Sequence, residues 1–354
     1  MVQMFGPVTF GCTALSLFAS TAGVWISIRV ARSVGMMDVP NERSSHSLPT
    51  PRMGGVPMVM AATLAFVGWV FLSSKGGSLS KGLLYTSFFA LAMFALGFVD
   101  DLRNLSPSFR FIVQLVSALF FLWILAPLFP DIRLERFAIP GMVWIPVGAV
   151  WAVWMVNLYN FMDGIDGLAG GEAAAVSSFF FLVFSYFGEY SWAAANLIVA
   201  AASMGFLVHN WPPARIFMGD GGSAFLGAYF GMQCVVAHLT TQVSFPVLVL
   251  PFANFILDTT YTLIRRAVRG EDWYQAHRSH IYQRMTNLGM THKTVTSIEL
   301  STVAFSCIAA VGCIATDIYG RIALVIIVIM GFAGAGLYVH RKELALRSGQ
   351  GGNI

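Results

Sequence analysis

Two aspartates, Asp163 and Asp166, follow the apolar run Ile145–Val156 and lie in a glycine-rich stretch that ends at Gly171. If this segment remains helical, side chains three residues apart lie on one face, about one turn from each other. Two carboxylates on one face form a cation site. The alternative is a glycine-rich turn with solvated acids, and further acidic motifs in the chain decide between the two interpretations.

A second motif places two adjacent carboxylates, Asp100 and Asp101, at the end of another apolar run. An acid at the centre of a bilayer costs about 2.5 to 3.5 kcal/mol on insertion scales and less toward the interface, so both residues are functional candidates. Adjacent helical residues point in different directions. A shared metal therefore requires a distorted last turn; alternatively, one acid binds metal and the other acts as a base. Arg110 opens the next apolar run and could reach back toward a phosphate.

A third acid, Asp220, lies between Gly219 and Gly221 and precedes an apolar run. An aspartate in this position is often an N-cap or turn residue. The glycines also allow a phosphate to approach the N-terminus of the helix that follows. The role of a further acid, Asp258, is open, because it lies about two turns before Arg265 and can form an interfacial ion pair there.

Two basic loops accompany these acids. The loop 38–55 contains Pro40, Pro49 and Pro51, and Pro57 follows it; these prolines are incompatible with a regular helix. Positive charge and bare backbone amides for an anion are offered by Arg43, His46, Arg52 and the pair Gly54 and Gly55. The alternative is an ordinary basic loop. In residues 266–284, His277 and His280 are three apart, but no further soft ligands for zinc lie nearby. The arginines of this loop fit phosphate and sugar recognition better.

The composition identifies the elements that must position these residues. The chain has 354 residues, of which 57% are hydrophobic and 11% are charged, and its mean hydropathy is +0.71. Soluble proteins carry roughly 25% charged residues, so this is an integral membrane protein. Apolar runs of about 20 residues predict an all-α polytopic bundle and not a barrel, whose strands need about 10. About eleven spans are predicted, at residues 7–28, 54–73, 82–99, 109–129, 141–159, 172–187, 191–208, 223–240, 243–264, 298–316 and 320–339.

Charge predicts the orientation of this bundle. Eleven crossings place 16 of the 21 lysines and arginines on one side, and the other side receives Lys75, Lys81, Arg133, Arg136 and Arg321. By the positive-inside rule, the first side is cytoplasmic, which puts the N-terminus outside and the C-terminus inside. Every motif above falls on the cytoplasmic side. Residues 1–340 are predicted to form one transmembrane domain with a retained first span, and residues 341–354 a short cytoplasmic tail, flexible from Ser348.

The four cysteines lie in apolar runs without the spacing of metal ligands and are interpreted as small core residues.

Carboxylates and basic loops on one face of a bundle suit a divalent cation that holds a diphosphate. Mg²⁺ prefers carboxylates together with phosphate oxygens, and phosphoryl transfer depends mainly on positioning and charge neutralisation. A bundle also offers an apolar groove for a lipid. The residues alone therefore predict a metal-dependent phosphotransferase that acts on a lipid.

Four parts of the sequence resemble the polyprenyl-phosphate N-acetylaminosugar-1-phosphate transferases, the family of bacterial GlcNAc-1-phosphate transferase and phospho-MurNAc-pentapeptide translocase. They are Phe98–Asp101, Asn157–Gly170, Phe217–Ser223 and the loop 266–284, which occur in order within roughly residues 38 to 285. The resemblance implies that undecaprenyl phosphate attacks the sugar-bound phosphate of a UDP-N-acetylhexosamine at the cytoplasmic face of the bacterial inner membrane. UMP leaves, and a lipid diphosphate sugar remains.

The resemblance also implies site residues. Asp220 is similar to the family's magnesium ligand, with Mn²⁺ as the alternative metal, and Asp100 and Asp101 are similar to its catalytic pair, of which Asp101 is also assigned to the metal. Substrate contacts are expected from Arg52, Arg110, Asn160, Asp163, Asp166, His277, Arg278 and His280.

The sequence departs from the family at one motif. Where a His-x-His-His pattern is usual, this chain has His280, Ile281, Tyr282 and Gln283. The variant resembles a subgroup that initiates O-antigen or capsule, with GlcNAc, FucNAc or QuiNAc as the donor sugar, and argues against the peptidoglycan translocase. Besides the lipid bilayer, no nucleic-acid partner is expected, and a homodimer is left open.

Two other classes of function remain as alternatives. A secondary transporter of an anionic solute would place acids near the midplane and contain an inverted repeat, but no repeat is found in the sequence. A CDP-alcohol phosphotransferase would require a tighter series of acids on consecutive helical turns.

Overall fold

The computed structural model describes residues 6–40, 48–73, 79–134, 137–271 and 278–350. The chain is almost entirely helical there, with two short antiparallel hairpins. The helices are α1 (Pro7–Val34), α2 (Gly55–Leu72), α3 (Lys81–Arg103), α4 (Pro107–Leu125), η1 (Ala126–Leu128), η2 (Gly141–Val143), α5 (Trp144–Met162), α6 (Leu168–Tyr186), α7 (Tyr190–Asn210), α8 (Asp220–Thr240), α9 (Phe245–Val249), η3 (Leu250–Phe252), α10 (Ala253–Val268), α11 (Ile281–Asn287), α12 (His292–Ala315) and α13 (Ile318–Gln350). The strands are β1 (Met37–Asp38) paired with β2 (Thr50–Pro51), and β3 (Ile132–Leu134) paired with β4 (Phe137–Ile139).

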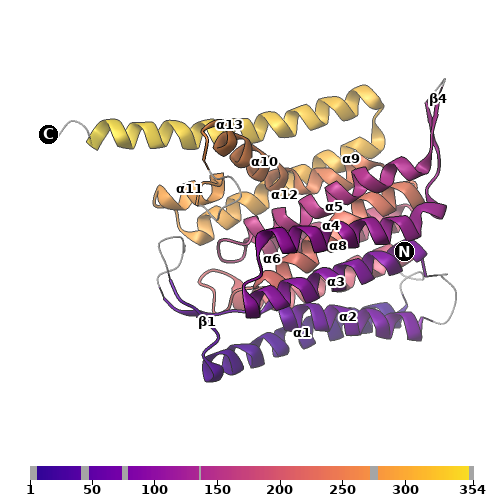
Figure 1. Cartoon of the computed structure of the whole chain (residues 1–354), viewed down its shortest axis with the longest axis horizontal. Coiled ribbons are helices and arrows are strands. Elements are labelled where there is room, and N and C mark those ends of the chain that lie inside the picture. Colours follow the sequence, from indigo (N-terminus) through magenta and orange to yellow (C-terminus); the bar gives the residue numbers. More distant parts are fainter. Residues whose placement is uncertain (1–5, 41–47, 74–78, 135–136, 272–277, 351–354) are drawn as a thin grey trace.

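The helices form a polytopic bundle, as predicted. Ten helical segments in the described part of the chain are long and apolar enough to cross a membrane. An eleventh long helix, α8, has 21 residues and matches the predicted span 223–240, but it is not among these ten. Its polar residues include Gln233 and His238. The helices run alongside one another, with α1 and α2 at one edge of the bundle and α13 at the other (Figure 1).

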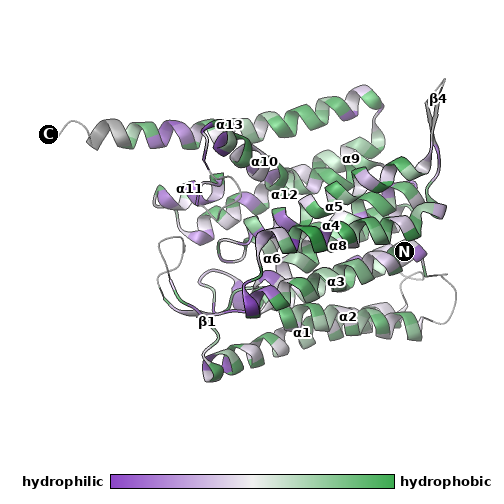
Figure 2. Cartoon of the chain, viewed as in Figure 1, coloured by the Kyte–Doolittle hydropathy of each residue, from purple (hydrophilic) through white to green (hydrophobic). Residues whose placement is uncertain are grey.

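The chain enters and leaves the bundle at opposite ends (Figure 1). Hydrophilic residues gather at the end where α3 finishes and α11 lies (Figure 2). The assignment of this end to the cytoplasm stays a prediction from charge. The final helix continues through Gln350, so the last residues up to that point are helical, whereas a flexible tail was predicted from Ser348.

The centre of the bundle is α8, which is buried along most of its length and packs against α2, α3 and α5. Glycines permit the close approach that this requires. A Cβ atom on Gly97 of α3 would lie 2.4 Å from the backbone oxygen of Asp220, and one on Gly55 of α2 would lie 2.5 Å from the Cα of Gly222. Real Cβ atoms do not approach so closely, so these glycines let α2 and α3 hold the N-terminal turn of α8 between them.

The predicted span 243–264 is not one regular helix. It consists of α9, the 3₁₀ turn η3 and α10, with Pro251 in the turn. Proline lacks a backbone N–H and clashes with the preceding helical turn, which explains the interruption. Because of this break, α10 is the helix that presents Asn254 and Asp258 to the bundle interior, where both are almost fully buried.

Two buried glutamates, Glu172 and Glu299, are bonded to the same side-chain amide of α10, that of Asn254. The Nδ2 of Asn254 donates hydrogen bonds to Oε2 of Glu172 on α6 at 3.2 Å and to Oε2 of Glu299 on α12 at 3.1 Å. Glu172 is 0% exposed and Glu299 is 7% exposed. Neither carboxylate forms an ion pair with a described residue, and Oε1 of Glu172 has no hydrogen-bond partner there. One amide therefore joins three helices in a region where charge is costly.

We expect the substitution Glu172→Gln to preserve or raise the thermal unfolding temperature of the purified protein, because it removes an ionisable group that lacks a countercharge. In contrast, Asn254→Leu should lower the free energy of unfolding by about 1 to 3 kcal/mol, because two buried carboxyl groups lose their donor. Thermal unfolding in detergent measures both. Equal destabilisation by the two variants would contradict this account of the cluster.

Candidate active site

Two segments that are remote in sequence pair through backbone hydrogen bonds next to the predicted site. Phe217 N–H donates to the oxygen of Pro51, and the N–H groups of Gly54 and Gly55 donate to the oxygens of Phe217 and Met218, each at 2.8 Å. These bonds join the basic loop 38–55 to the segment that leads into α8. The expectation that the amides of Gly54 and Gly55 would bind an anion is wrong, because both are already bonded to backbone oxygens.

The same pairing places Arg52 at the end of α3. Its Nη2 donates to the backbone oxygen of Asp101, an interaction that satisfies a carbonyl at a helix C-terminus. Met53, the next residue, has a positive φ of 76°, which is uncommon for a residue other than glycine. The loop thus holds Arg52 beside the predicted catalytic pair. The other basic side chains that were expected to contribute, those of Arg43 and His46, lie outside the described residues.

Asp101 joins α3 to α8. Its Oδ2 accepts a hydrogen bond of 3.1 Å from the N–H of Gly221, one of the donors in the first turn of α8 that have no partner within the helix. The positive end of the helix dipole also favours a carboxylate there. Asp220 occupies the first turn of α8, and its Oδ1 accepts a hydrogen bond of 2.9 Å from Nδ2 of Asn160. The structure therefore brings Asp101, Asp220 and Asn160 together from α3, α8 and α5.

Arg110 lies between two of the predicted acids. Its Nη1 bonds to Oδ2 of Asp100 and is 3.6 Å from Oδ2 of Asp220. Asp100 also accepts a hydrogen bond of 2.7 Å from the N–H of Leu105, and its side chain is only 6% exposed. The side chains of Asp220 and Arg110 are 39% and 32% exposed. Asp100 is thus buried and bonded to Leu105 and Arg110, whereas the side chains of Asp220 and Arg110 remain partly exposed at the site.

Asp163 adds a third carboxyl group at this point. It is the C-cap residue of α5 and is only partly exposed. Burial raises the pKa of its carboxyl well above the usual value, and the negative charges of Asp220 and Asp101 raise this pKa further. Carboxylates that repel one another in this way form a site that a cation stabilises.

Asp163 and Asp166 do not form the two-acid site that a continuous helix would produce. Helix α5 ends at Met162, and α6 begins only at Leu168 after a turn in which Gly167 has a φ of +75°. Asp166 instead accepts a hydrogen bond of 3.0 Å from the N–H of Ala214, and its Oδ1 lies 3.1 Å from Nδ1 of His292. The charges of Asp101 and Asp220 act on Asp163. Asp166 instead contacts His292 and so connects the turn to α12.

Asp258, whose role was open, organises the last loop. Its carboxylate accepts hydrogen bonds from the N–H groups of Ile281 at 2.8 Å and Tyr282 at 3.2 Å, and it lies 3.3 Å from Nδ1 of His280. It therefore satisfies the first backbone donors of α11. Among the described residues, Asp258 forms no ion pair with Arg265, and the neighbouring Arg266 pairs with Glu271.

His280 and Tyr282 are held below the surface of this loop. His280 is 2% exposed, and its ring lies near the rings of Phe161 and Tyr282. The hydroxyl of Tyr282 donates to the oxygen of Phe161 at 2.9 Å, which ties α11 to the end of α5 beside Asp163. Arg278 is partly exposed, and within the described residues its Nε has no hydrogen-bond partner. The predicted substrate contact His277 lies outside the described residues.

We expect Asp258→Ala to lower the free energy of unfolding by about 1 to 3 kcal/mol, because two buried backbone donors and His280 lose their acceptor. The exposed Asp317→Ala is a suitable control, since Asp317 accepts a single N–H, that of Gly320, and should have a much smaller effect. Thermal unfolding of both variants tests this. A loss of activity in Asp258→Ala without destabilisation would contradict the structural role.

The donors at this site fit a particular kind of metal. Among the described residues, no group of three or more histidine, cysteine, aspartate or glutamate side chains could hold a metal ion by itself. Mg²⁺ usually takes only one or two carboxylates and completes its coordination with water and substrate phosphate. Asp220 and Asp101 fit this requirement, while Asp100 is engaged by Arg110. The residues present therefore suit a cation that arrives with a phosphorylated substrate.

Sequence reasoning missed several residues of this region. Glu172, Glu299 and Tyr282 received no role, and the contact of His292 with Asp166 was not expected. Glu172 and Glu299 lie within predicted spans, so the rule that an acid in a membrane segment is a candidate would have identified both. For Tyr282 and His292 no local pattern indicates the contacts.

The chain is similar to known membrane transferases. Residues 83–238, from α3 to α8, match the family described as glycosyl transferase family 4. A probable undecaprenyl-phosphate N-acetylglucosaminyl 1-phosphate transferase of Bacillus subtilis is 28% identical over 75% of this chain and 74% of the relative. A decaprenyl-phosphate N-acetylglucosaminephosphotransferase of Mycobacterium tuberculosis is 28% identical over 76% and 73%. A phospho-N-acetylmuramoyl-pentapeptide-transferase of Geobacillus thermodenitrificans is 32% identical over 62% and 69%.

The region matched to the family contains the acids that converge in space. Asp100, Asp101, Asp163 and Asp220 all lie within it, on or beside the three helices α3, α5 and α8 that meet at the hydrophilic end of the bundle. Both the arrangement of helices and the relatives agree with the resemblance found in the motifs. The chain therefore belongs to glycosyl transferase family 4 and is a member of the polyprenyl-phosphate aminosugar-1-phosphate transferases.

Proposed function

We propose that this protein transfers an N-acetylaminosugar-1-phosphate from a UDP-sugar to undecaprenyl phosphate. A phosphate oxygen of the acceptor forms a bond to the sugar-linked phosphorus, and the bond from that phosphorus to the oxygen of UMP breaks. UMP leaves with the bonding electron pair, and undecaprenyl diphosphate sugar is the product. The main support is the convergence of Asp101 and Asp220 with Arg110 and Arg52 at one end of a membrane bundle.

The residues divide into two groups in this proposal. Asp220 and Asp101 hold a divalent cation, which when bound neutralises charge on the diphosphate of the donor. Asp100 orients the guanidinium of Arg110 toward the open surface, where it lies 3.6 Å from Asp220 and can bind a phosphate. Arg52, fastened to the end of α3, adds positive charge on the same side.

The nucleotide and the sugar are assigned to the part of the site formed by α5 and the loop 266–284. Asn160 is bonded to Asp220, and the charge of Asp220 acts on Asp163. Tyr282 and His280 contact Phe161, close to Asn160 and Asp163 at the end of α5. The donor is proposed to be UDP-GlcNAc, UDP-FucNAc or UDP-QuiNAc. With the variant residues Tyr282 and Gln283, the proposal extends to initiation of O-antigen or a similar surface polysaccharide at the cytoplasmic face of the bacterial inner membrane.

The proposal is tested by incubating the purified protein with undecaprenyl phosphate and each radiolabelled UDP-sugar, followed by extraction of labelled lipid. We expect one donor to yield labelled lipid together with an equal amount of UMP. Transport of solute into vesicles without labelled lipid would favour the transporter, and a product that requires a CDP-alcohol would favour the other phosphotransferase class. Absence of product with every UDP-sugar would refute the proposed function.

A further inference from the structure

The end of α13 is bonded to α11 through an ion pair that the proposed function does not use. Nε of Arg284 donates to Oε1 of Glu343 at 2.8 Å, and Nη2 of Arg284 donates to Oε2 of Glu343 at 2.7 Å. The side chain of Arg284 is only 5% exposed, and that of Glu343 is 27% exposed. Two parallel bonds between a guanidinium and a carboxylate fix their orientation as well as their distance. This pair therefore determines how α11 and the end of α13 lie against each other.

The length of α13 allows this contact. The helix has 33 residues, which corresponds to about 50 Å, whereas the hydrocarbon core of a bilayer is about 30 Å thick. Part of α13 must therefore lie outside the hydrocarbon core, and Figure 1 shows its C-terminal part passing α11 and ending beyond the other helices. Glu343, the single acidic residue in the sequence of α13, belongs to this part.

The short helix α11 depends on bonds from outside itself. It has seven residues, and isolated helices shorter than about 12 to 15 residues are marginal in water. At its N-terminus, the carboxylate of Asp258 accepts hydrogen bonds from the N–H groups of Ile281 and Tyr282. In its last turn, Arg284 is bonded to Glu343. One carboxylate from α10 and one from α13 therefore hold the two ends of α11.

Tyr282 connects α11 to the turn that carries Asp163. Its hydroxyl donates to the backbone oxygen of Phe161 at 2.9 Å. The same hydroxyl lies so close to Gly164 that a Cβ atom on this glycine would be 2.1 Å from it. Phe161 and Gly164 lie on either side of Asp163 in the sequence, and the charges of two other site acids act on that residue. The position of α11 therefore affects the position of Asp163.

Loss of the Glu343 carboxylate would displace α11. The charges of Arg265 and Arg284 repel each other, and both attract Glu343. A buried charge that loses its partner is strongly destabilised. Arg284 would therefore leave its buried position, while Asp258 would still hold the first residues of α11. The expected result is a displaced α11 in an otherwise folded protein.

We propose that Glu343 is a positioning residue for the transfer reaction, which through Arg284 holds α11 against the turn of Asp163. This inference rests on the proposed function, in which the nucleotide and the sugar bind to α5 and the loop 266–284, and it adds the end of α13 to the groups that determine affinity for the donor. When α11 is displaced in a fraction of the molecules, the apparent affinity for the UDP-sugar falls accordingly. Saturating UDP-sugar restores the competent arrangement.

The substitution Glu343→Gln tests this role, because glutamine keeps the shape of the side chain and removes its charge. We expect KM for the UDP-sugar to rise about tenfold, which corresponds to about 1.4 kcal/mol. The values of kcat and of KM for undecaprenyl phosphate should not change. Glu343→Asp retains the charge and should have a smaller effect. Lys342→Gln is the matched control, because it removes a charge from the exposed neighbouring residue of α13, and its kinetic constants should equal those of the unmodified protein.

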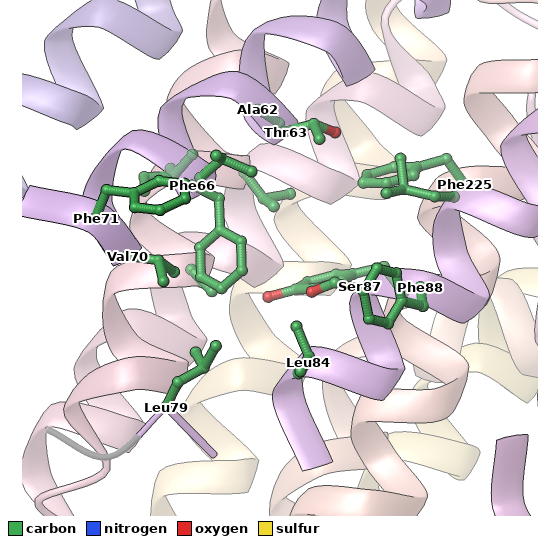
Figure 3. A pocket seen from close by; sticks show the side chains of 16 residues that line it. Ala62, Thr63, Phe66, Val70, Phe71, Leu79, Leu84, Ser87, Phe88 and Phe225 are labelled. Carbon is green, nitrogen blue, oxygen red and sulfur yellow. The ribbon is translucent and has the colours of Figure 1, made fainter. Parts of the chain in front are cut away.

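A second control separates positioning from a general loss of stability. Leu84 of α3 lines an apolar pocket of about 190 Å³ between α2, α3, α7 and α8 (Figure 3). Leu84→Ala enlarges this pocket and should lower the thermal unfolding temperature. Leu84 lies about 25 Å along α3 from Asp101, so KM for the UDP-sugar should not change. A rise in this KM that follows the loss of stability in both Leu84→Ala and Glu343→Gln would overturn the positioning role.

Hydrogen exchange in the unmodified protein tests the inference even if Glu343→Gln does not fold. Coupling between two sites is reciprocal, so bound donor must favour the arrangement in which Glu343 holds α11. Saturating UDP-sugar, without acceptor, should therefore slow amide exchange in α11 and in α13 around Glu343, but not in α1.

Three results would overturn the inference: protection of α11 without protection of α13 around Glu343, an unchanged KM for the UDP-sugar in Glu343→Gln, or an equal rise in both KM values in that variant. Failure of the proposed function is recognised separately, because the unmodified protein would then form no labelled lipid from any UDP-sugar.

Discussion

Asp101→Asn and Asp220→Asn should each reduce the rate of sugar-phosphate transfer by about a thousandfold or more, an effect typical of the loss of a charge that stabilises the transition state. Asparagine has nearly the same shape as aspartate. Its oxygen can still accept the N–H of Gly221 at position 101 or the amide of Asn160 at position 220. What the substitution removes is the negative charge that holds a cation, so the fold should survive while activity is lost.

Initial rates of the purified variants, measured with saturating donor and acceptor, check this expectation. Asp131→Asn is a matched control, because Asp131 also accepts one backbone N–H, that of Gly141 at 3.0 Å, but lies outside the site. Its rate should equal that of the unmodified protein. Thermal unfolding and gel filtration establish that each variant is folded. Near-normal turnover in either Asp101→Asn or Asp220→Asn would contradict the assignment of these acids.

The sequence is sufficient to predict the bundle because a membrane allows few alternatives. Backbone groups within hydrocarbon must be bonded internally, so long apolar runs become helices whatever their neighbours are. The central helix α8 was predicted despite Gln233 and His238 because the rest of its run is long and apolar. The break at η3 was not predicted, although Pro251 was visible in the sequence, because some membrane helices tolerate proline.

The site was predictable where charge is costly and unpredictable where contacts are remote. Asp100, Asp101 and Asp220 were identified as candidates because acids next to apolar runs are unusual, and Arg110 lies near both Asp100 and Asp220. The interpretation of Asp163 and Asp166 as one pair failed because it required a continuous helix, whereas the chain turns between Met162 and Leu168. The local pattern around Asp258 likewise gives no indication that its carboxylate accepts a hydrogen bond from the N–H of Ile281, because that contact depends on how α10 and α11 pack.

The pairing of the loop 38–55 with the segment before α8 shows the same limit. The glycines suggested amides available to an anion, but the segments meet through backbone bonds between residues more than 160 positions apart, such as Gly54 and Phe217. This pairing also determines where Arg52 lies, which the sequence pattern does not indicate. Arg52 is bonded to the backbone oxygen of Asp101, so the basic loop contributes to the candidate site by fixing the position of Arg52.

Removal of divalent cations should abolish activity, and addition of Mg²⁺ or Mn²⁺ should restore it. The physical reason is that Asp101, Asp163 and Asp220 gather negative charge at a point where a diphosphate must also bind. Arg110 is partly neutralised by Asp100, so a cation is needed to offset the remaining repulsion. The expected measurement is the transfer rate after treatment with EDTA and after titration with each metal, with thermal unfolding to verify that the fold persists.

Two variants make this prediction specific to the site. Asp163→Asn removes one of the three negative groups and should raise the Mg²⁺ concentration for half-maximal activity about tenfold, as expected for a residue that supports a metal without being its main ligand. Asp166→Asn should leave that concentration unchanged, because Asp166 contacts His292 and the N–H of Ala214 instead. Full activity after exhaustive chelation would reject the metal requirement, and equal shifts in both variants would show that Asp163 has no particular place beside the cation.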